Sequence, residues 1–192
     1  MAVSQAHISD TAGQYLMRFP DERNRLERLT SALAGDSALT SRKEFSGHVT
    51  CGVVILDAHW RVLHIRHNAL GRWLLPGGHL ESEDVFLIDA ALREAREETG
   101  LTPTEFRSLE GFADMPLDID VHRIPENADK EERDHWHFDF RFAFRFTGSS
   151  PIRLQAEEVS GYEWLHPDAI PAVELQKKLT GRLWCDSNPT LR

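Results

Sequence analysis

The chain has 192 residues, a formal net charge of −9 and 41% hydrophobic residues, a composition typical of one globular domain with a modest extension. The negative charge argues against broad binding of nucleic acid or anionic membranes, which requires a basic surface. No apolar run approaches the ~18 residues of a membrane span, and the N-terminus lacks a signal-peptide pattern, so we expect a cytoplasmic protein. The two cysteines, Cys51 and Cys185, show neither a disulfide framework nor zinc-ligand spacing.

Residues 1–45 are expected to form a helical extension. Residues 10–19 are predicted as a short helix that stops at Pro20, and Asp21 is a candidate N-cap for a second helix. Three leucines then recur at helical spacing: Leu26, Leu29 and Leu33. Such an extension could pack on the core, join a dimer interface or cover a ligand, and the sequence does not choose among these.

Strand patterns begin near residue 48. Residues 49–56 are β-branched and apolar, as in a strand buried on both faces, and residues 61–67 should pair back on them as a hairpin. Further strands are predicted at 73–75, 106–112, 118–124, 135–146 and 161–165. With helices predicted at 85–99 and from Pro171 onward, this order indicates an α+β fold in which helices cover a mixed sheet.

Several glutamates lie close together near the C-terminal end of the helix predicted at 85–99. Glu94, Glu97 and Glu98 share one helix face, and like charges one turn apart repel each other by ~0.2–0.5 kcal/mol. Glu97 and Glu98 also precede Gly100, the expected C′ residue, at the negative end of the helix dipole. A pattern of this kind is more often a solvated helix face. The like-charge repulsion and the helix dipole both disfavour these glutamates, so a compensating interaction is expected nevertheless. A bound cation is the simplest one.

The stretch from Gly78 to Leu101 resembles the signature of the Nudix hydrolase family. It opens with Pro76-Gly77-Gly78-His79, and the second half of the signature is complete: Arg93-Glu94-Ala95-Arg96-Glu97-Glu98-Thr99-Gly100-Leu101. The first half departs from the family pattern. Counting back from Arg93 puts Val85 where the first glutamate belongs, so one residue is inserted, and Glu83 or Asp84 is expected to take over a mainly supporting role.

The resemblance covers roughly residues 46–183 and implies a Nudix-type α/β/α sandwich with a mixed β-sheet. We therefore divide the chain into an N-terminal helical extension (1–45), a Nudix hydrolase domain (46–185) and a C-terminal tail (186–192). The resemblance also implies hydrolysis of a diphosphate bond with Mg²⁺ or Mn²⁺, since divalent cations neutralise the phosphates and help to generate hydroxide.

The resemblance assigns metal binding to Glu94, Glu97 and Glu98, with the carbonyl of Gly77 or Gly78 assisting. Carboxylates and carbonyls are the oxygen ligands that these cations prefer. Glu94 is the candidate general base, a role that Glu97 or Glu98 could share.

Two further residues complete the implied catalytic set. Arg93 is expected to orient the glutamates through a salt bridge. Glu158, or as second choice Glu157, resembles the glutamate that many family members add from a loop before a late strand; an exposed acidic loop is the alternative.

Polar residues alternate along the strand predicted at 135–146. His135, His137 and Asp139 share the face opposite the aromatic residues, so we expect this face to meet solvent or a cleft. With His122 they could form a second metal or phosphate site, although a polar sheet face or pocket lining is the more common arrangement. Further candidate substrate contacts are His79 and Trp73; for Trp73, core packing is the alternative.

The expected partner is a small nucleotide-like molecule, such as ADP-ribose, a nucleotide sugar or a nucleoside triphosphate. We expect no nucleic acid and no membrane as partner, and a homodimer is one option. The alternative to an enzyme is a non-catalytic Nudix-like domain with a ligand-binding or regulatory role. An isopentenyl-diphosphate isomerase is rejected, because the turn at 75–78 lacks the cysteine that this chemistry needs.

Overall fold

The computed structural model describes residues 2–127 and 132–181. Within them the helices are α1 (Gln5–Arg18), α2 (Glu27–Ala34), α3 (Leu87–Thr99) and α4 (Val173–Thr180), with 3-10 turns at Pro20–Glu22, Pro103–Glu105 and Pro167–Ala169. The strands are β1 (His48–Leu56), β2 (Val62–His67), β3 (Arg72–Leu74), β4 (Gly77–His79), β5 (Phe106–Ser108), β6 (Asp118–Ile124), β7 (His135–Phe146) and β8 (Val159–Leu165). Cys185 and the predicted tail lie outside the described residues.

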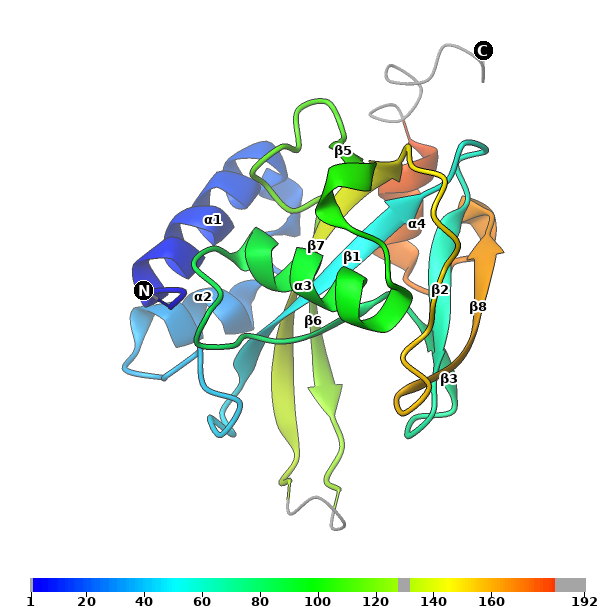
Figure 1. The fold of residues 1–192 in the computed structure, drawn as a ribbon. Helices are drawn as coiled ribbons and strands as arrows, with labels where there is room; N and C mark the ends of the chain where they lie inside the picture. Colours follow the sequence, from blue (N-terminus) through cyan, green and yellow to red (C-terminus); the bar gives the residue numbers. More distant parts are fainter. Residues whose placement is uncertain (1, 128–131, 182–192) are drawn as a thin grey trace.

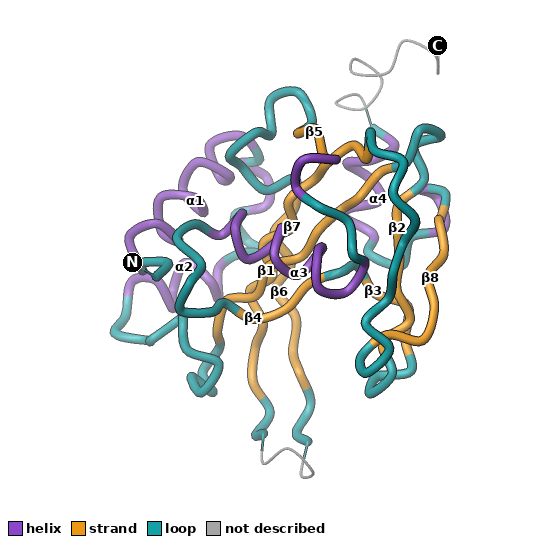
Figure 2. The backbone as a smooth tube through the Cα atoms, viewed as in Figure 1, coloured by secondary structure: helices purple, strands orange, loops and turns teal. Residues whose placement is uncertain are grey.

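The sheet is mixed and is built around β1 and β7, which run parallel to each other in the middle of it (Figure 1). All nine residues of β1 are buried, as their β-branched apolar pattern predicts. Strands β2 and β4 pair antiparallel with β1, β6 and β5 pair antiparallel with β7, and β3 and β8 flank β2. The ribbon of β6 and β7 reaches beyond the other strands at one end of the molecule (Figure 2).

Helices cover both faces of the sheet, which confirms the predicted sandwich. The face formed by alternate residues such as Cys51 and Phe140 packs against α1, α2 and α3 in one apolar cluster. The opposite face, which includes Val54 and Ala143, packs against Leu175 of α4 in a second cluster. Every second residue of β7 is aromatic, and this period of two places four phenylalanines in the first cluster.

The N-terminal extension packs on the core. Leu26 and Leu29 are fully buried in the cluster that also holds the sheet phenylalanines, which supports the helical spacing seen in the sequence. The first helix is longer than predicted, because the Ser4 side chain accepts a hydrogen bond from the His7 N–H at 3.1 Å and caps it earlier. The prediction of Asp21 as an N-cap was wrong: it lies in a 3-10 turn, and α2 begins at Glu27.

Three further boundaries differ from the sequence prediction. Gly77 and Gly78 form strand β4 rather than a turn, because their backbone pairs with Cys51 and Gly52 of β1. Helix α3 begins at Leu87 rather than near residue 85, and the predicted strand at 106–112 ends at Ser108. In the described part of the chain, no helix is both long and apolar enough to cross a membrane.

Candidate active site

Helix α3 lies close to β1 and β4 because the residues between them are small. Ala90, Ala91 and Ala95 are fully buried on the sheet side of the helix. Gly78 of β4 permits the closest approach, since a β-carbon at this position would overlap the carboxylate of Glu94. The helix ends at Gly100, which has a φ of 71° and therefore adopts the left-handed conformation predicted for a C′ glycine. The glutamates of α3 are thus held against the strand that precedes the helix.

Glu98 is a buried carboxylate beside the backbone of β4. Its residue is 3% exposed, and its Oε2 accepts a hydrogen bond from the Gly77 N–H at 2.9 Å. Burial raises the pKa of Glu98 to about 8 although the hydrogen bond from Gly77 opposes the shift, and the negative charges of Glu94, Glu158 and Glu97 add to it. Burial likewise raises the pKa of Glu94, although Arg93 opposes this shift. The negative charges of Glu97 and Glu158 thus raise the pKa of both buried carboxylates, and Arg93 offsets part of this effect at Glu94.

Arg93 forms hydrogen bonds both to the segment before α3 and to the glutamates of α3. Its Nη1 donates to Glu94 Oε1 at 2.9 Å and to Glu97 Oε2 at 3.1 Å. Its Nε and Nη2 donate to the two oxygens of Asp84 at 3.2 and 3.1 Å, and Nη2 also donates to the carbonyl of His79 at 2.8 Å. This fork geometry orients two glutamates from a buried anchor.

The inserted residue leaves this support in place. Asp84 is 3% exposed and also accepts the N–H of Glu81 at 2.8 Å, whereas Glu83 is exposed. Of the two candidates for the missing glutamate, Asp84 therefore contacts Arg93. The insertion is accommodated in the exposed segment before α3, where the Asp89 carboxylate accepts the N–H groups of Val85 and Phe86.

Glu158 lies in the loop before β8, near enough to Glu94 and Glu98 for its charge to act on them. The loop is attached to the turn after β2, where the Asn68 N–H donates to the Glu158 carbonyl at 2.7 Å. The Asn68 side chain donates to the carbonyls of Ala156 and Glu157. Glu158 itself is exposed, and its charge raises the pKa of both Glu94 and Glu98.

Comparison with known proteins agrees with this geometry. A family model described as NUDIX domain matches residues 47–183. The chain belongs to the Nudix family. It is 35% identical to a probable DHNTP pyrophosphohydrolase from Lactococcus lactis subsp. cremoris, over 43% of this chain and 45% of that protein. It is 31% identical to the human m7GpppN-mRNA hydrolase NUDT17, over 62% of this chain and 36% of that protein. The matches thus span less than half the length of these curated relatives.

Two solved structures share the fold at low sequence identity. The Caenorhabditis elegans Ap4A hydrolase superposes with a TM-score of 0.53 at 16% identity, over 69% of this chain and 94% of that one. The Escherichia coli dihydroneopterin triphosphate pyrophosphohydrolase gives a TM-score of 0.51 at 17% identity, over 68% and 91% of the two chains. At these identities the likeness establishes the architecture alone.

The other predicted contacts of this Nudix domain come from strands β3, β4 and β7. Trp73 is half-buried on β3, beside Gly161 of β8. His79, His135 and His137 lie on the sheet face opposite α3, together with Asp139. The Asp139 carboxylate is already engaged, because it accepts hydrogen bonds from Arg141 Nε at 2.8 Å and from the Thr50 hydroxyl at 3.0 Å.

The expectation that this face meets solvent or a cleft was wrong for His135, whereas His137 and Asp139 are half-buried. His135 is 3% exposed because the ring of Phe45, from the segment before β1, packs edge-on against it. Farther along β7, Arg141 is buried and bonds to Asp118 and Asp120 of β6.

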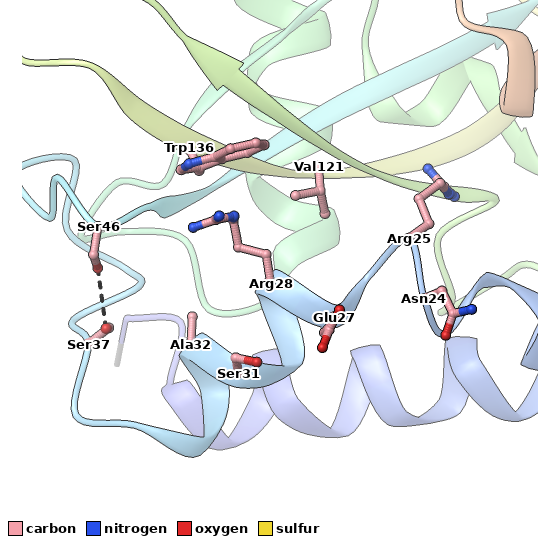
Figure 3. Close-up of a pocket in the computed structure, with 10 residues that line it drawn as sticks. All are labelled: Asn24, Arg25, Glu27, Arg28, Ser31, Ala32, Ser37, Ser46, Val121 and Trp136. Carbon is pink, nitrogen blue, oxygen red and sulfur yellow. Dashed lines mark hydrogen bonds between the residues drawn. The ribbon is translucent and has the colours of Figure 1, made fainter.

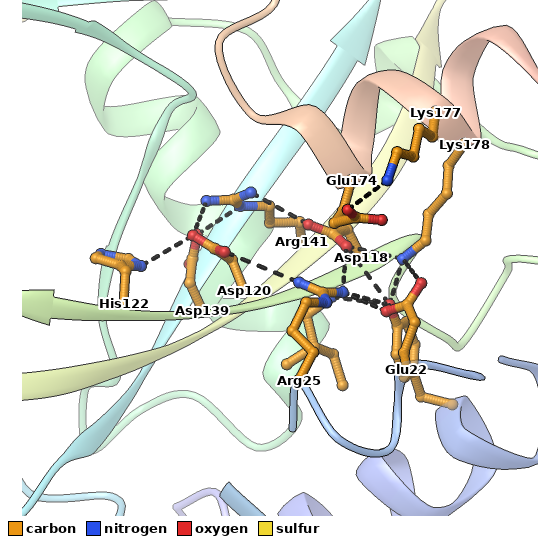
Figure 4. A network of polar contacts seen from close by, with 12 residues as sticks. Glu22, Arg25, Asp118, Asp120, His122, Asp139, Arg141, Glu174, Lys177 and Lys178 are labelled. Atoms are coloured by element: carbon orange, nitrogen blue, oxygen red, sulfur yellow. Dashed lines mark hydrogen bonds and ion pairs between the residues drawn. The ribbon is translucent and has the colours of Figure 1, made fainter. Parts of the chain in front are cut away.

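A buried ionic network that was not predicted from the sequence lies at that end of the face (Figure 4). Asp118 is fully buried. Its carboxylate accepts hydrogen bonds from Arg141 Nη1 at 3.1 Å, Arg25 Nη2 at 3.0 Å and Lys178 Nζ at 2.7 Å. These cations hold the pKa of Asp118 below its usual value despite burial. The partners come from β7, the segment before α2, and α4, so no local pattern could connect them.

A groove of about 620 Å³ lies between α2 and the β6–β7 ribbon (Figure 3). The guanidinium of Arg28 stacks over the ring of Trp136 at 4.2 Å, beside Val121. The lining includes none of the predicted catalytic or metal-binding residues.

Proposed function

We propose that this chain hydrolyses a diphosphate bond in a nucleoside diphosphate linked to another moiety, with Mg²⁺ or Mn²⁺ as the cofactor. The observation that carries the proposal is the environment of Glu98, a buried carboxylate whose pKa is raised to about 8 in the company of three other carboxylates. A divalent cation is the natural counter-charge for such a group. The donors are carboxylates and nearby carbonyls, which suit Mg²⁺ and Mn²⁺.

We assign the cation to Glu94, Glu97 and Glu98, with the carbonyl of Gly77 or Gly78 as a further ligand. When bound, the cation would neutralise phosphate charge and lower the pKa of water. These residues come from two elements whose spacing is fixed by the hydrogen bond from Gly77 to Glu98 and by the absence of a side chain at Gly78. Such rigidity supports a preorganised site.

The remaining roles concern protons and orientation. We assign Glu94 as the general base that takes a proton from the attacking water, a role that Glu97 or Glu98 could share. Arg93 positions Glu94 and Glu97 through its two hydrogen bonds. Glu158 would add a carboxylate from the loop before β8, and its exposure makes it accessible to a ligand.

The substrate we propose is a small nucleotide-like molecule, for example ADP-ribose, a nucleotide sugar or a nucleoside triphosphate. Names of similar proteins, such as the Ap4A hydrolase and the dihydroneopterin triphosphate pyrophosphohydrolase, support this class without selecting a member. Contacts of Trp73 and His79 with the substrate, and a homodimer, stay predictions. The alternative, a domain that binds a ligand without turnover, is disfavoured because all three signature glutamates are present.

The test is a substrate screen on the purified full chain with Mg²⁺ or Mn²⁺, comparing Glu97→Gln and Glu98→Gln with Glu83→Gln. The control glutamate is exposed and lies outside the cluster. We expect many-fold loss of turnover in the first two variants, little change in the control, and reversible inhibition by a chelator. Chelator-resistant cleavage would refute the metal mechanism, and unchanged turnover in both variants would refute the assigned residues. Binding without any cleavage would favour the alternative.

A further inference from the structure

Five histidines form a row across four neighbouring strands, on the face of the sheet turned away from the α3 glutamates. The strand register places His48 of β1 directly opposite His137 of β7, and His137 opposite His122 of β6. His79 of β4 pairs with Thr50, which has the same facing as His48. His135 lies two residues before His137 and so shares its face.

Three of these rings converge on one point. One nitrogen from each of His48, His135 and His137 lies within 4.8 Å of the others. The Nε2 atoms of His135 and His137 are 3.1 Å apart. Three ligands of a tetrahedral Zn²⁺, bound at about 2.0–2.1 Å, have nitrogens separated by roughly 3.3 Å, so a small inward movement would complete the geometry.

The backbone fixes the orientation of two of the rings. His48 Nδ1 lies 3.1 Å from the carbonyl of Glu44, and His135 Nδ1 lies 2.7 Å from the carbonyl of Arg133. A carbonyl can only accept, so each Nδ1 carries the proton. In a neutral ring this leaves the Nε2 lone pair directed toward the centre of the cluster. A ligand histidine whose other nitrogen donates to a backbone carbonyl is the usual arrangement at protein metal sites.

We propose that His48, His135 and His137 form a second metal site, which binds a transition-metal ion such as Zn²⁺ and is separate from the carboxylate site. The fourth position would be taken by water or by His79, whose Nε2 is 3.1 Å from that of His48. Because the ligands come from β1 and β7, the ion would cross-link two strands at the end where β7 begins.

The surroundings favour a borderline metal over Mg²⁺. His48 and His135 are 1% and 3% exposed, so they are partly shielded from competing water. Neutral imidazole suits Zn²⁺, Co²⁺, Ni²⁺ and Cu²⁺, whereas Mg²⁺ prefers oxygen ligands. The two sites should therefore discriminate between the two classes of cation.

The experiment is a Co²⁺ titration of the full chain, stripped of metal and then given excess Mg²⁺ to occupy the carboxylate site, followed by visible absorption. We expect one tight equivalent of Co²⁺, displaced by Zn²⁺. His137→Gln and the double variant His135→Gln/His137→Gln should weaken binding by roughly tenfold or more. His64→Gln is the matched control, because His64 is as buried as His135 and also bonds to a backbone carbonyl, that of Val62, but lies outside the row. Glu97→Gln should bind Co²⁺ as the wild type does.

A second measurement on the wild type protects the test against variants that fail to fold. The Cu²⁺-loaded protein should show hyperfine coupling to at least two imidazole nitrogens in its electron paramagnetic resonance spectrum. The proposal is overturned if the wild type binds no Co²⁺ in excess Mg²⁺, if the bound copper lacks nitrogen ligands, or if the His64 control loses as much affinity as the cluster variants.

Discussion

Replacing Glu98 with glutamine should make the metal-free protein more stable at pH 8 while removing most of its activity. The folded-state pKa of Glu98 is raised from 4.5 to about 8, so between these values the folded protein holds a proton that the unfolded chain has released. The stability of the wild type must therefore fall as the pH rises through this window. At about 1.4 kcal/mol for each pKa unit, the full effect is ~5 kcal/mol. Glutamine does not titrate, and its carbonyl oxygen can still accept the Gly77 N–H.

The assay is urea denaturation of wild type and Glu98→Gln in a chelator, at several values between pH 5 and pH 8.5. We expect the free energy of unfolding of the variant, relative to that of the wild type, to increase by several kcal/mol from the low to the high end of this pH range. Added Mg²⁺ should raise the stability of the wild type and leave the variant nearly unchanged. A stability difference that stays constant from pH 5 to pH 8 would show that burial does not raise the pKa of Glu98, and the argument that this site binds a cation would fail.

Three further substitutions test separate parts of the structure. Gly78→Ala should cut turnover many-fold at near-normal stability, because its methyl group would displace the Glu94 carboxylate, whereas Gly13→Ala in open space on α1 should leave kcat unchanged. Asp84→Asn should lower kcat while changing KM little, because it weakens the hydrogen bonds that anchor Arg93. A change in KM as large as the change in kcat would argue against a positioning role for Asp84. Asp118→Asn should lower the free energy of unfolding by ~3 kcal/mol, since it leaves buried cations uncompensated; a loss near zero in thermal or urea unfolding would contradict this.

The sequence predicted the parts of the site that are local along the chain. The spacing of Glu94, Glu97 and Glu98, together with Gly100, indicated a helix of the right length with its carboxylates on one face, and α3 has that form. The alternation of aromatic residues along residues 135–146 predicted the buried face of β7 correctly. Both patterns depend on a fixed period within one element, which a single sequence displays directly.

Contacts between distant elements could not be predicted in this way. His48 was not among the candidate residues, because only the parallel pairing of β1 with β7 brings it beside His137. The same holds for Asp118 and Lys178, which meet across a sequence separation of 60 residues. Gly77 and Gly78 suggested a turn, since glycine is common there, and their strand pairing became evident only from the partner strand.

The contact between the N-terminal helix and the sheet has a consequence for where this protein can be cut. The Tyr15 hydroxyl accepts the backbone N–H of Ile119 at 3.3 Å, and among the described residues β6 pairs with β7 alone, so its other edge has no strand beside it. Removal of residues 1–45 would leave that N–H without its partner and uncover the apolar surface now packed against Leu26 and Leu29. An uncovered strand edge beside apolar surface is a template for intermolecular pairing. The family match begins at residue 47, but the unit that folds and stays monodisperse should begin with α1.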